Sequence, residues 1–100
     1  MNAFALLGLA QRAGKLASGF DAVHRAVVRG RAKLIILSID ASARTAERTR
    51  RIAGEYGVPC IAWATMQELG QAVGKPDRAV VALLDEGFAS AVRKALLRGE

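Results

Sequence analysis

The stretch Lys33-Leu34-Ile35-Ile36-Leu37-Ser38-Ile39 decides the fold that this chain is expected to adopt. β-Branched and leucine side chains follow one another through its centre, and no polar residue interrupts them. A strand with one face in water alternates apolar and polar residues, whereas a continuous apolar run is typical of a strand covered on both faces. We therefore predict a β-strand over residues 33–39, in a sheet with helices packed on each side.

Helices are predicted directly before and after this strand. Residues 19–29 carry apolar side chains at helical spacing, and Gly30 ends the pattern. After the strand, Asp40-Ala41-Ser42 offers an N-cap for a helix that runs to about residue 56 and stops at Gly57. The central strand is thus expected to lie between two helices along the chain.

The rest of the chain continues this alternation of helices and short strands. The other expected elements are a helix over residues 3–13 capped by Asn2, an extended piece at 15–17, a strand at 58–64, a helix opened by the capping box of residues 65–68 and closed by Gly74, a strand at 78–84, and a last helix capped by Asp85 or Glu86. Such an alternation predicts an α/β fold, namely a three-layer α/β/α sandwich, in a single domain over residues 1–100.

The composition is that of a soluble globular domain. Of the 100 residues, 52% are apolar and 24% are charged, and no apolar run approaches the roughly 20 residues of a membrane span. The first residues lack a basic leader, so we expect a cytoplasmic protein. Cys60 lies in an apolar run and is expected in the core. A single cysteine and a single histidine, His24, cannot form an internal disulfide or assemble a metal site together.

Positive charge is concentrated in the first half of the chain. The formal net charge is +6, and residues 12–51 hold ten Lys and Arg against three Asp and Glu, a surplus of seven. This asymmetry predicts a one-sided positive surface that binds a polyanion, and nucleic acid is the commonest such partner in the cytosol. The alternative is a basic protein without a polyanionic partner.

The start of the helix over residues 19–29 is a candidate binding site within this basic half. The first turn of a helix has backbone N–H groups without partners, and Gly19 lets a phosphate backbone approach them closely, with its own N–H facing that backbone. Arg25 and Arg29 are four residues apart and share one face. The alternative is that Ser18 is an ordinary N-cap, with Asp21 in the first turn.

No catalytic motif is found. Gly8 and Gly14-Lys15 have the wrong spacing for a phosphate-binding loop, and no dinucleotide-binding fingerprint follows a strand. Asp40 and Asp85 each follow a predicted strand and could pair to bind a metal or transfer protons, but helix capping accounts for both. We predict that the protein is not an enzyme and has no cofactor and no metal ion.

Several segments in order resemble a known family. They are Leu7-Gly8-Leu9-Ala10-Gln11-Arg12-Ala13-Gly14-Lys15, Gly19, residues 26–34, Asp40-Ala41-Ser42, Thr45, Gly57-Val58-Pro59, Glu68-Leu69-Gly70, Ala72-Val73-Gly74-Lys75 and Gly87-Phe88-Ala89. Together they resemble the kink-turn-binding ribosomal-protein family of the large-subunit seven-Ae type, in its small bacterial YlxQ-like branch. The likeness spans nearly the whole chain, and its order and spacing are more specific than any single motif. It implies a mixed four-stranded sheet and binding to structured RNA without cofactor or catalysis.

The resemblance also implies where RNA binds. In that family the contacts come from the start of the second helix, the loop after the next strand and the loop before the last strand, which here are residues 18–22 with Arg25, 39–42 and 75–78. The family signature Gly-Thr-Asn-Glu aligns with Gly19-Phe20-Asp21-Ala22. Its asparagine and glutamate read the guanines of sheared G·A pairs. Ala22 cannot accept a hydrogen bond from a base, which predicts weakened kink-turn selectivity.

The prediction as a whole is a non-catalytic, monomeric protein that binds a folded, bent or internal-loop RNA, ribosomal or ribosome-associated. The residues expected at the interface are Lys15, Ser18, Gly19, Phe20, Asp21, Arg25, Arg29, Asp40, Ser42, Arg44, Lys75 and Arg78. Phe20 either stacks on an unpaired base or plugs the core, whereas Arg31 and Lys33 are expected at the far end. The alternative function is a protein-interaction module on the same fold with only non-specific affinity for nucleic acid.

Overall fold

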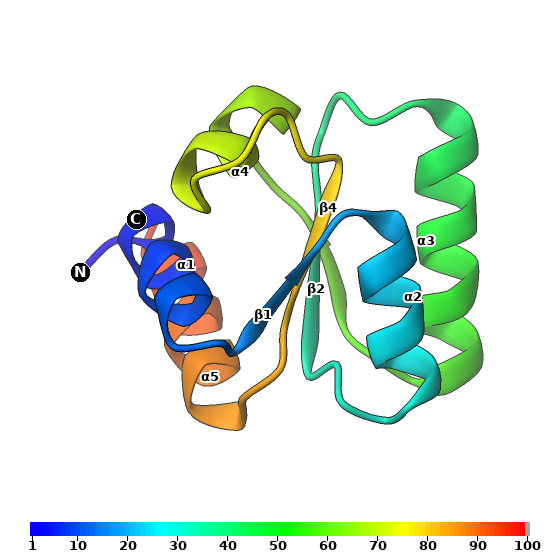
Figure 1. Cartoon of the computed structure of the whole chain (residues 1–100), viewed down its shortest axis with the longest axis horizontal. Coiled ribbons are helices and arrows are strands. Elements are labelled where there is room, and N and C mark those ends of the chain that lie inside the picture. The colour runs from blue at the N-terminus through cyan, green and yellow to red at the C-terminus, as the bar shows by residue number, and fades with distance from the viewer. Residues whose placement is uncertain (100) are drawn as a thin grey trace.

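A computed structural model describes residues 1–99 of the chain. Helices and strands alternate along the chain, with extents of 31 × 25 × 23 Å (Figure 1). In chain order they are α1 (Ala3–Arg12), β1 (Leu16–Ser18), α2 (Phe20–Val28), β2 (Leu34–Leu37), α3 (Ala43–Tyr56), β3 (Cys60–Ala62), α4 (Met66–Ala72), β4 (Val80–Leu83) and α5 (Glu86–Leu97). Every predicted element is present, although the strands β2, β3 and β4 are shorter than predicted.

The four strands form one mixed sheet in the order β1-β4-β2-β3. β4 runs antiparallel to both β1 and β2, and β2 pairs with β3 in parallel. At the centre of the sheet, Ile35 is opposite Ala82 on β4 and Cys60 on β3. The family resemblance implied such a mixed four-stranded sheet, and this expectation is confirmed.

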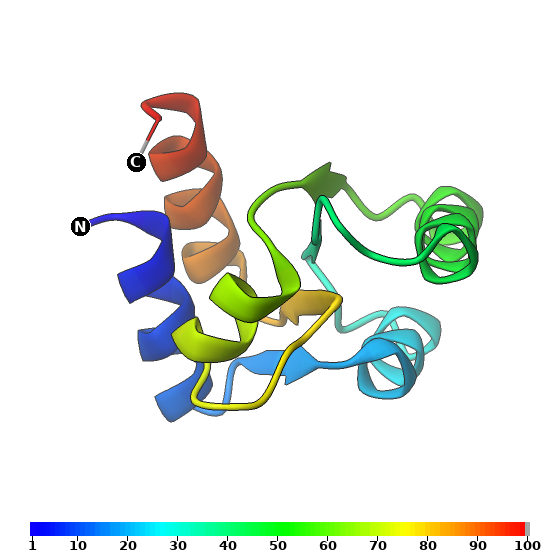
Figure 2. The same cartoon turned by 90° about the horizontal axis from the view of Figure 1, so that it is seen from above.

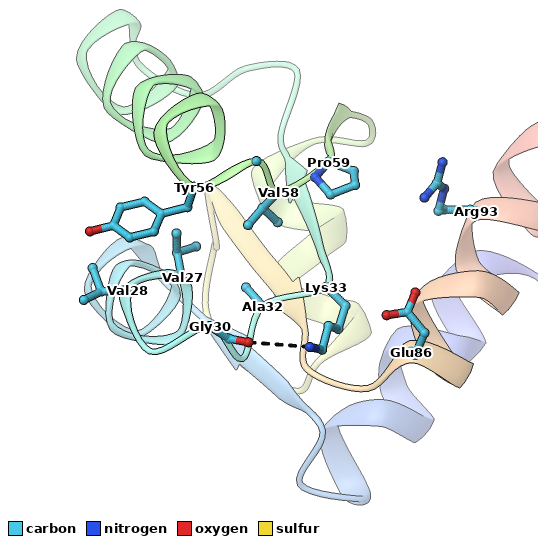
Figure 3. A pocket seen from close by; sticks show the side chains of 11 residues that line it. Val27, Val28, Gly30, Ala32, Lys33, Tyr56, Val58, Pro59, Glu86 and Arg93 are labelled. Atoms are coloured by element: carbon cyan, nitrogen blue, oxygen red, sulfur yellow. Dashed lines mark hydrogen bonds between the residues drawn. The ribbon is translucent and has the colours of Figure 1, made fainter.

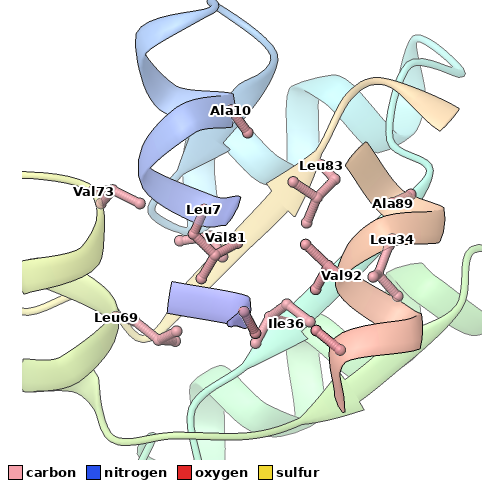
Figure 4. Packing of buried hydrophobic residues seen from close by; sticks show 12 residues of the cluster. Leu7, Ala10, Leu34, Ile36, Leu69, Val73, Val81, Leu83, Ala89 and Val92 are labelled. Atoms are coloured by element: carbon pink, nitrogen blue, oxygen red, sulfur yellow. The ribbon is translucent and has the colours of Figure 1, made fainter. Parts of the chain in front are cut away.

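Helices cover both faces of the sheet. α1, α4 and α5 pack on one face, and α2 and α3 pack on the other (Figures 1 and 2). Alternate residues of β2 point into two separate hydrophobic clusters, Leu34 and Ile36 into the first and Ile35 into the second. Figure 4 shows the first cluster, where Leu7, Val92 and Leu83 meet. This two-sided burial explains why the sequence of β2 lacks polar alternation, and it confirms the three-layer prediction.

Most helix caps agree with the sequence patterns. The side chain of Asn2 accepts a hydrogen bond from the Ala5 N–H at 2.8 Å, and Asp85 accepts one from the Phe88 N–H at 3.0 Å. The capping box of α4 is also present, because Thr65 and Glu68 each accept a bond from the other's backbone N–H. Local side-chain chemistry therefore determines where these three helices begin.

One buried hydroxyl gives a stability prediction. Thr49 on α3 is fully buried, and its Oγ1 has no hydrogen-bond partner among residues 1–99. Because valine has nearly the same shape and no hydroxyl to desolvate, Thr49→Val is expected to raise the free energy of unfolding by about 1 kcal/mol. Thr45→Val is the control, since Thr45 Oγ1 accepts a hydrogen bond from Ser42 Oγ at 3.0 Å. Urea denaturation of both variants tests this, and an equal effect of the two substitutions would contradict it.

Candidate nucleic-acid interface

Three loops that are distant in sequence meet at one end of the sheet. β1 and β2 end here, at Ser18 and Leu37, and β4 begins here. The Gly19 N–H donates to the Val80 carbonyl at 2.9 Å, and the Ser38 N–H donates to the Ala79 carbonyl at 2.8 Å. We call this end, formed by residues 18–22, 38–42 and 75–79, the loop end; it is the upper edge of the sheet in Figure 1. The loop end contains residues 18–22, 39–42 and 75–78, the segments that the family resemblance implied at the interface.

A hollow at the loop end collects several predicted residues. It has a volume of about 410 Å³, and residues 18–22, Arg25 and residues 77–79 line it. The start of α2 thus faces the loop that precedes β4, and Arg25 and Arg78 both line the hollow; the Arg78 guanidinium also donates to the carbonyls of Pro76 and Asp77. Asp21 and Asp77 line the hollow as well, so it has no surplus of positive charge, and the two arginines are the side chains there that can contact a phosphate chain.

Gly19 determines how α2 begins. Its φ of 88° and ψ of 154° lie in a region that essentially only glycine adopts. The prediction that its N–H faces RNA is wrong, because that N–H is used in the bond to β4. Ser18 is a residue of β1 and not the N-cap, and no side chain caps α2. The first intrahelical bond is donated by Val23, so the amides of residues 20–22 are the donors left at the hollow.

Phe20 is held between charged and aromatic neighbours. Its side chain is partly buried against the cluster between α2 and α3. The guanidinium carbon of Arg48 on α3 lies 4.1 Å from the ring centroid, and the His24 ring centroid lies 5.6 Å away. This arrangement is a cation–π contact that fixes Arg48 beside the start of α2. Phe20 was expected either to stack on an unpaired base or to pack in the core. Its packing is closer to that of a core residue.

Asp40 links two loops instead of capping the next helix. Its Oδ1 accepts a hydrogen bond from the Met66 N–H at 2.8 Å, at the first residue of α4. The Met66 carbonyl in turn accepts from the Arg78 N–H at 3.0 Å. The prediction that Asp40 caps the following helix is wrong, because Ser42 is the N-cap of α3 and accepts from the Thr45 N–H. A chain of bonds therefore runs from the loop after β2 to the loop before β4.

We expect the Asp40 bond to contribute to stability. Asp40→Ala removes the acceptor for the first amide of α4 and should lower the free energy of unfolding by about 1 kcal/mol, while Asp40→Asn keeps an oxygen and should lose less. Asp77→Ala is a matched control, since Asp77 is an exposed carboxylate at the same hollow. Chemical denaturation measures all three variants. Equal stability of the Asp40→Ala and Asp77→Ala proteins would show that the bond contributes nothing.

Other predicted residues lie away from the hollow. Lys15 is at the opposite end of the sheet, where its carbonyl accepts from the Leu84 N–H at 2.9 Å. Arg29 is the C-cap of α2, about 13 Å along the helix from its start. Arg44 is exposed in the first turn of α3, beyond the Ser42 cap, and Lys75 is exposed with its N–H bonded to the Gly70 carbonyl. The structure thus groups Ser18, Gly19, Phe20, Asp21, Arg25 and Arg78, and it leaves Lys15 and Arg29 apart.

Sequence reasoning missed two residues that shape the loop end. Met66 joins Asp40 to Arg78 through its backbone, and a backbone contact leaves no signal in residue type. Gly70 lies under the loop before β4, where a Cβ would be 2.9 Å from the Lys75 carbonyl oxygen. A glycine within a short predicted helix is a signal for such a close approach, and it could have identified Gly70.

The groups considered for catalysis are separated in the fold. Asp40 follows β2 and Asp85 follows β4, and because these strands are antiparallel the two carboxylates lie at opposite ends of the sheet. The alternative of a paired carboxylate site is therefore wrong. Cys60 is only half-buried and not a core residue as predicted. Burial raises the pKa of the Cys60 thiol, although the positive charge of Arg50 partly opposes this shift. No helix within residues 1–99 is both long enough and apolar enough to cross a membrane.

Comparisons with known proteins agree with this architecture. The RNA-binding protein YlxQ of Bacillus subtilis is 43% identical to this chain over 90 residues, covering 90% of each protein. The protein of the same name from Enterococcus faecium is 34% identical and covers 95% of this chain and 91% of its own length. A solved structure of a protein of unknown function from Bacillus halodurans superposes with a TM-score of 0.89 at 36% identity, covering 94% of this chain and 95% of that one.

A more distant structure has the same fold. The Giardia lamblia 15.5kD RNA binding protein superposes with a TM-score of 0.80 at 18% identity, and the match covers 95% of this chain and 82% of that protein. The family model described as ribosomal protein L7Ae/L30e/S12e/Gadd45 matches residues 1–93. This chain belongs to the ribosomal protein L7Ae/L30e/S12e/Gadd45 family.

Proposed function

We propose that this chain is a non-catalytic protein that binds structured RNA with its loop end. The observation that carries the proposal is the hollow at the start of α2, where the uncapped first-turn amides lie beside Arg25 and Arg78. Helix N-termini and arginine side chains are the groups with which proteins commonly contact phosphates. The similarity to two proteins named RNA-binding protein YlxQ supports the same function.

The shape of the loop end favours a bent RNA over a regular duplex. Residues 18–22 with Arg25 and residues 77–79, from two parts of the chain, line a hollow of about 410 Å³, which can receive an unpaired nucleotide or a sharply turned backbone. We propose an internal loop or kink-turn in ribosomal or ribosome-associated RNA as the target, bound by a cytoplasmic monomer. Arg48, fixed against the Phe20 ring, extends the positive charge from the hollow onto α3.

The hydrogen bonds of Asp40 and Asp85 support a role in binding without catalysis. Asp40 and Asp85 each accept a hydrogen bond from a backbone amide at the start of a helix. A carboxylate held in this way is positioned for helix capping rather than for proton transfer. The proposal therefore gives neither residue a catalytic role.

The dependence of RNA affinity on salt tests the proposal. If about four or five phosphates are neutralised, the logarithm of affinity should fall with the logarithm of salt concentration with a slope near −4. Arg25→Ala should weaken binding to all RNAs alike and make the slope about one unit shallower. Fluorescence anisotropy with a kink-turn RNA and an unstructured oligonucleotide gives both measurements.

The control variant for this experiment is Arg31→Ala. Arg31 is exposed and lies just before β2, at the opposite end of the sheet from the hollow. Arg31→Ala should leave the affinity of the chain for both RNAs nearly unchanged. A slope near zero, or equal losses from Arg25→Ala and Arg31→Ala, would contradict binding at the loop end. Equal affinity for the two RNAs would instead favour a protein-interaction module with only non-specific affinity for nucleic acid.

A further inference from the structure

A second concave surface lies at the end of the sheet opposite the loop end. It has a volume of about 360 Å³ and is formed where α2 and α3 end and where β2 and α5 begin (Figure 3). We call it the far-end groove, and its lining residues include Val28, Lys33, Tyr56, Val58, Pro59 and Arg93. Residues 33–39 span about 20 Å between the two ends of the sheet, so the far-end groove is separate from the RNA site proposed above.

Apolar side chains form one side of the far-end groove. Val28, the last residue of α2, is 51% exposed, and Tyr56, the last residue of α3, is 50% exposed. Figure 3 shows both on the same side, with Val27 and Val58 beside them. Two large apolar groups left half in water on neighbouring helix ends form a surface that an apolar side chain of a partner can cover.

Positive charge lies next to these apolar residues. Lys33 Nζ is 3.5 Å from the Gly30 carbonyl, and Arg93 extends from α5 on the other side of the groove (Figure 3). Glu86 also lines the groove, but within residues 1–99 it forms no ion pair with either cation. Arg29 and Arg31 are exposed on either side of Gly30 in the chain and extend this positive region.

We propose that the far-end groove docks an acidic peptide segment of a partner protein. An apolar side chain of the peptide would pack against Val28 and Tyr56, and carboxylates on both sides of it would lie near Lys33 and Arg93. Glu86, which lies on the α5 side of the groove below Arg93 in Figure 3, disfavours a carboxylate placed beside it. The peptide chemistry that fits is therefore an apolar anchor flanked by acidic residues rather than an unbroken acidic run.

A peptide fits this groove better than a second RNA segment does. The valine and proline residues of the lining offer no aromatic ring on which a base can stack, and Tyr56 is the one aromatic residue in the lining, where successive stacking of bases needs several. Glu86 would also repel a phosphate placed between Lys33 and Arg93, whereas an apolar anchor at the same position has no charge to be repelled.

Binding of defined peptides tests the proposal. The probe is a short fluorescein-labelled peptide with a central Leu-Phe pair and Asp and Glu on both sides. The neutral control peptide has Asn and Gln in place of the acidic residues. The acidic peptide should bind the whole chain about tenfold more tightly than the neutral one. Lys33→Ala combined with Arg93→Ala should remove this preference, and Tyr56→Ala should weaken binding of both peptides about fivefold. Circular dichroism and thermal melts check that each variant is folded.

Controls separate docking from a general charge effect. Arg25→Ala combined with Arg78→Ala removes the same charge from the loop end and should leave the affinity for the acidic peptide unchanged. NMR shifts on titration should concentrate at Val28, Tyr56 and Val58. The proposal is overturned if the chain binds the acidic peptide no more tightly than the neutral one. It is also overturned if the double substitution at Lys33 and Arg93 and the one at Arg25 and Arg78 weaken binding of the acidic peptide equally. It is also overturned if oligouridylate displaces the peptide from the far-end groove, and none of these results depends on whether the loop end binds RNA.

Discussion

Gly70→Ala is expected to lower the free energy of unfolding by about 3 kcal/mol, because the added methyl group meets backbone atoms that cannot move aside alone. A Cβ on Gly70 would lie 2.7 Å from the Pro76 carbonyl carbon and closer still to its oxygen. The loop is also tied to the helix, since the Lys75 N–H donates to the Gly70 carbonyl at 2.9 Å. Relieving the overlap therefore requires α4 and the loop before β4 to separate.

Gly54→Ala is the matched control for this change. Gly54 also lies inside a helix, α3, but a Cβ there would meet nothing within 4 Å. Alanine at that position should raise the free energy of unfolding by about 1 kcal/mol, because it has the higher helix propensity. Urea denaturation of both variants should give effects of opposite sign. A Gly70→Ala protein as stable as the wild type would show that the loop accommodates a side chain.

Gly70→Ala should also weaken RNA binding, because it displaces Arg78. Arg78 lies two residues after Pro76 and lines the hollow at the loop end. If the loop moves away from α4, Arg78 moves with it, and the folded Gly70→Ala protein should bind RNA more weakly than the Gly54→Ala protein. Anisotropy titrations below the melting temperature of the variant measure this effect separately from stability.

Asp21→Asn combined with Ala22→Glu is expected to raise affinity for a standard kink-turn by about tenfold or more. The change restores the asparagine and glutamate of the family signature, which read guanines in sheared G·A pairs. Both positions line the hollow at the start of α2, so the new side chains would face the bound RNA. The carboxylate lost at residue 21 is replaced by one at residue 22, so the net charge of the hollow does not change and the gain is expected from base recognition alone.

Two comparisons make this gain specific. The double variant should bind a kink-turn whose G·A pairs are replaced by Watson–Crick pairs no better than the wild type does. A second double variant with the same charges, Asp21→Asn combined with His24→Glu, should show no such gain, because His24 does not line the hollow. If the wild type and the Asp21→Asn, Ala22→Glu variant bind the kink-turn with equal affinity, the kink-turn assignment is wrong. RNA binding itself is tested separately by the dependence of affinity on salt.

The order and type of the elements could be predicted because the signals are local. The continuous apolar run of β2 required cover on both faces, and Asn2, Thr65 and Asp85 begin their helices with their own side chains. The residues at which the strands begin and end were predicted less accurately. β3 was predicted over residues 58–64 and spans only Cys60–Ala62, and the backbone of Ala64, with a φ of 68°, is no longer extended.

The binding role of the candidate site stays a prediction, and several expected positions and contacts of its residues were wrong. Asp40 precedes a helix in sequence, yet its hydrogen-bond partner is Met66, 26 residues away. Lys15 is close to Gly19 in sequence, but the extended strand β1 between them places the two residues at opposite ends of the sheet. Proximity along the chain was a poor guide here because an extended segment of a few residues crosses much of a small domain.

The α/β/α layering, the starts of α1, α4 and α5 and the basic first half of the chain follow from local patterns, because apolar periodicity, capping side chains and charge are properties of neighbouring residues. Three groupings appear in the folded chain alone. Arg25 and Arg78 line one hollow, Gly70 supports the loop before β4, and a groove at the other end is lined by Val28, Tyr56, Lys33 and Arg93. These groupings depend on strand order and on which loops end at the same edge of the sheet. Contacts between segments far apart in the chain set both, and no local pattern records them.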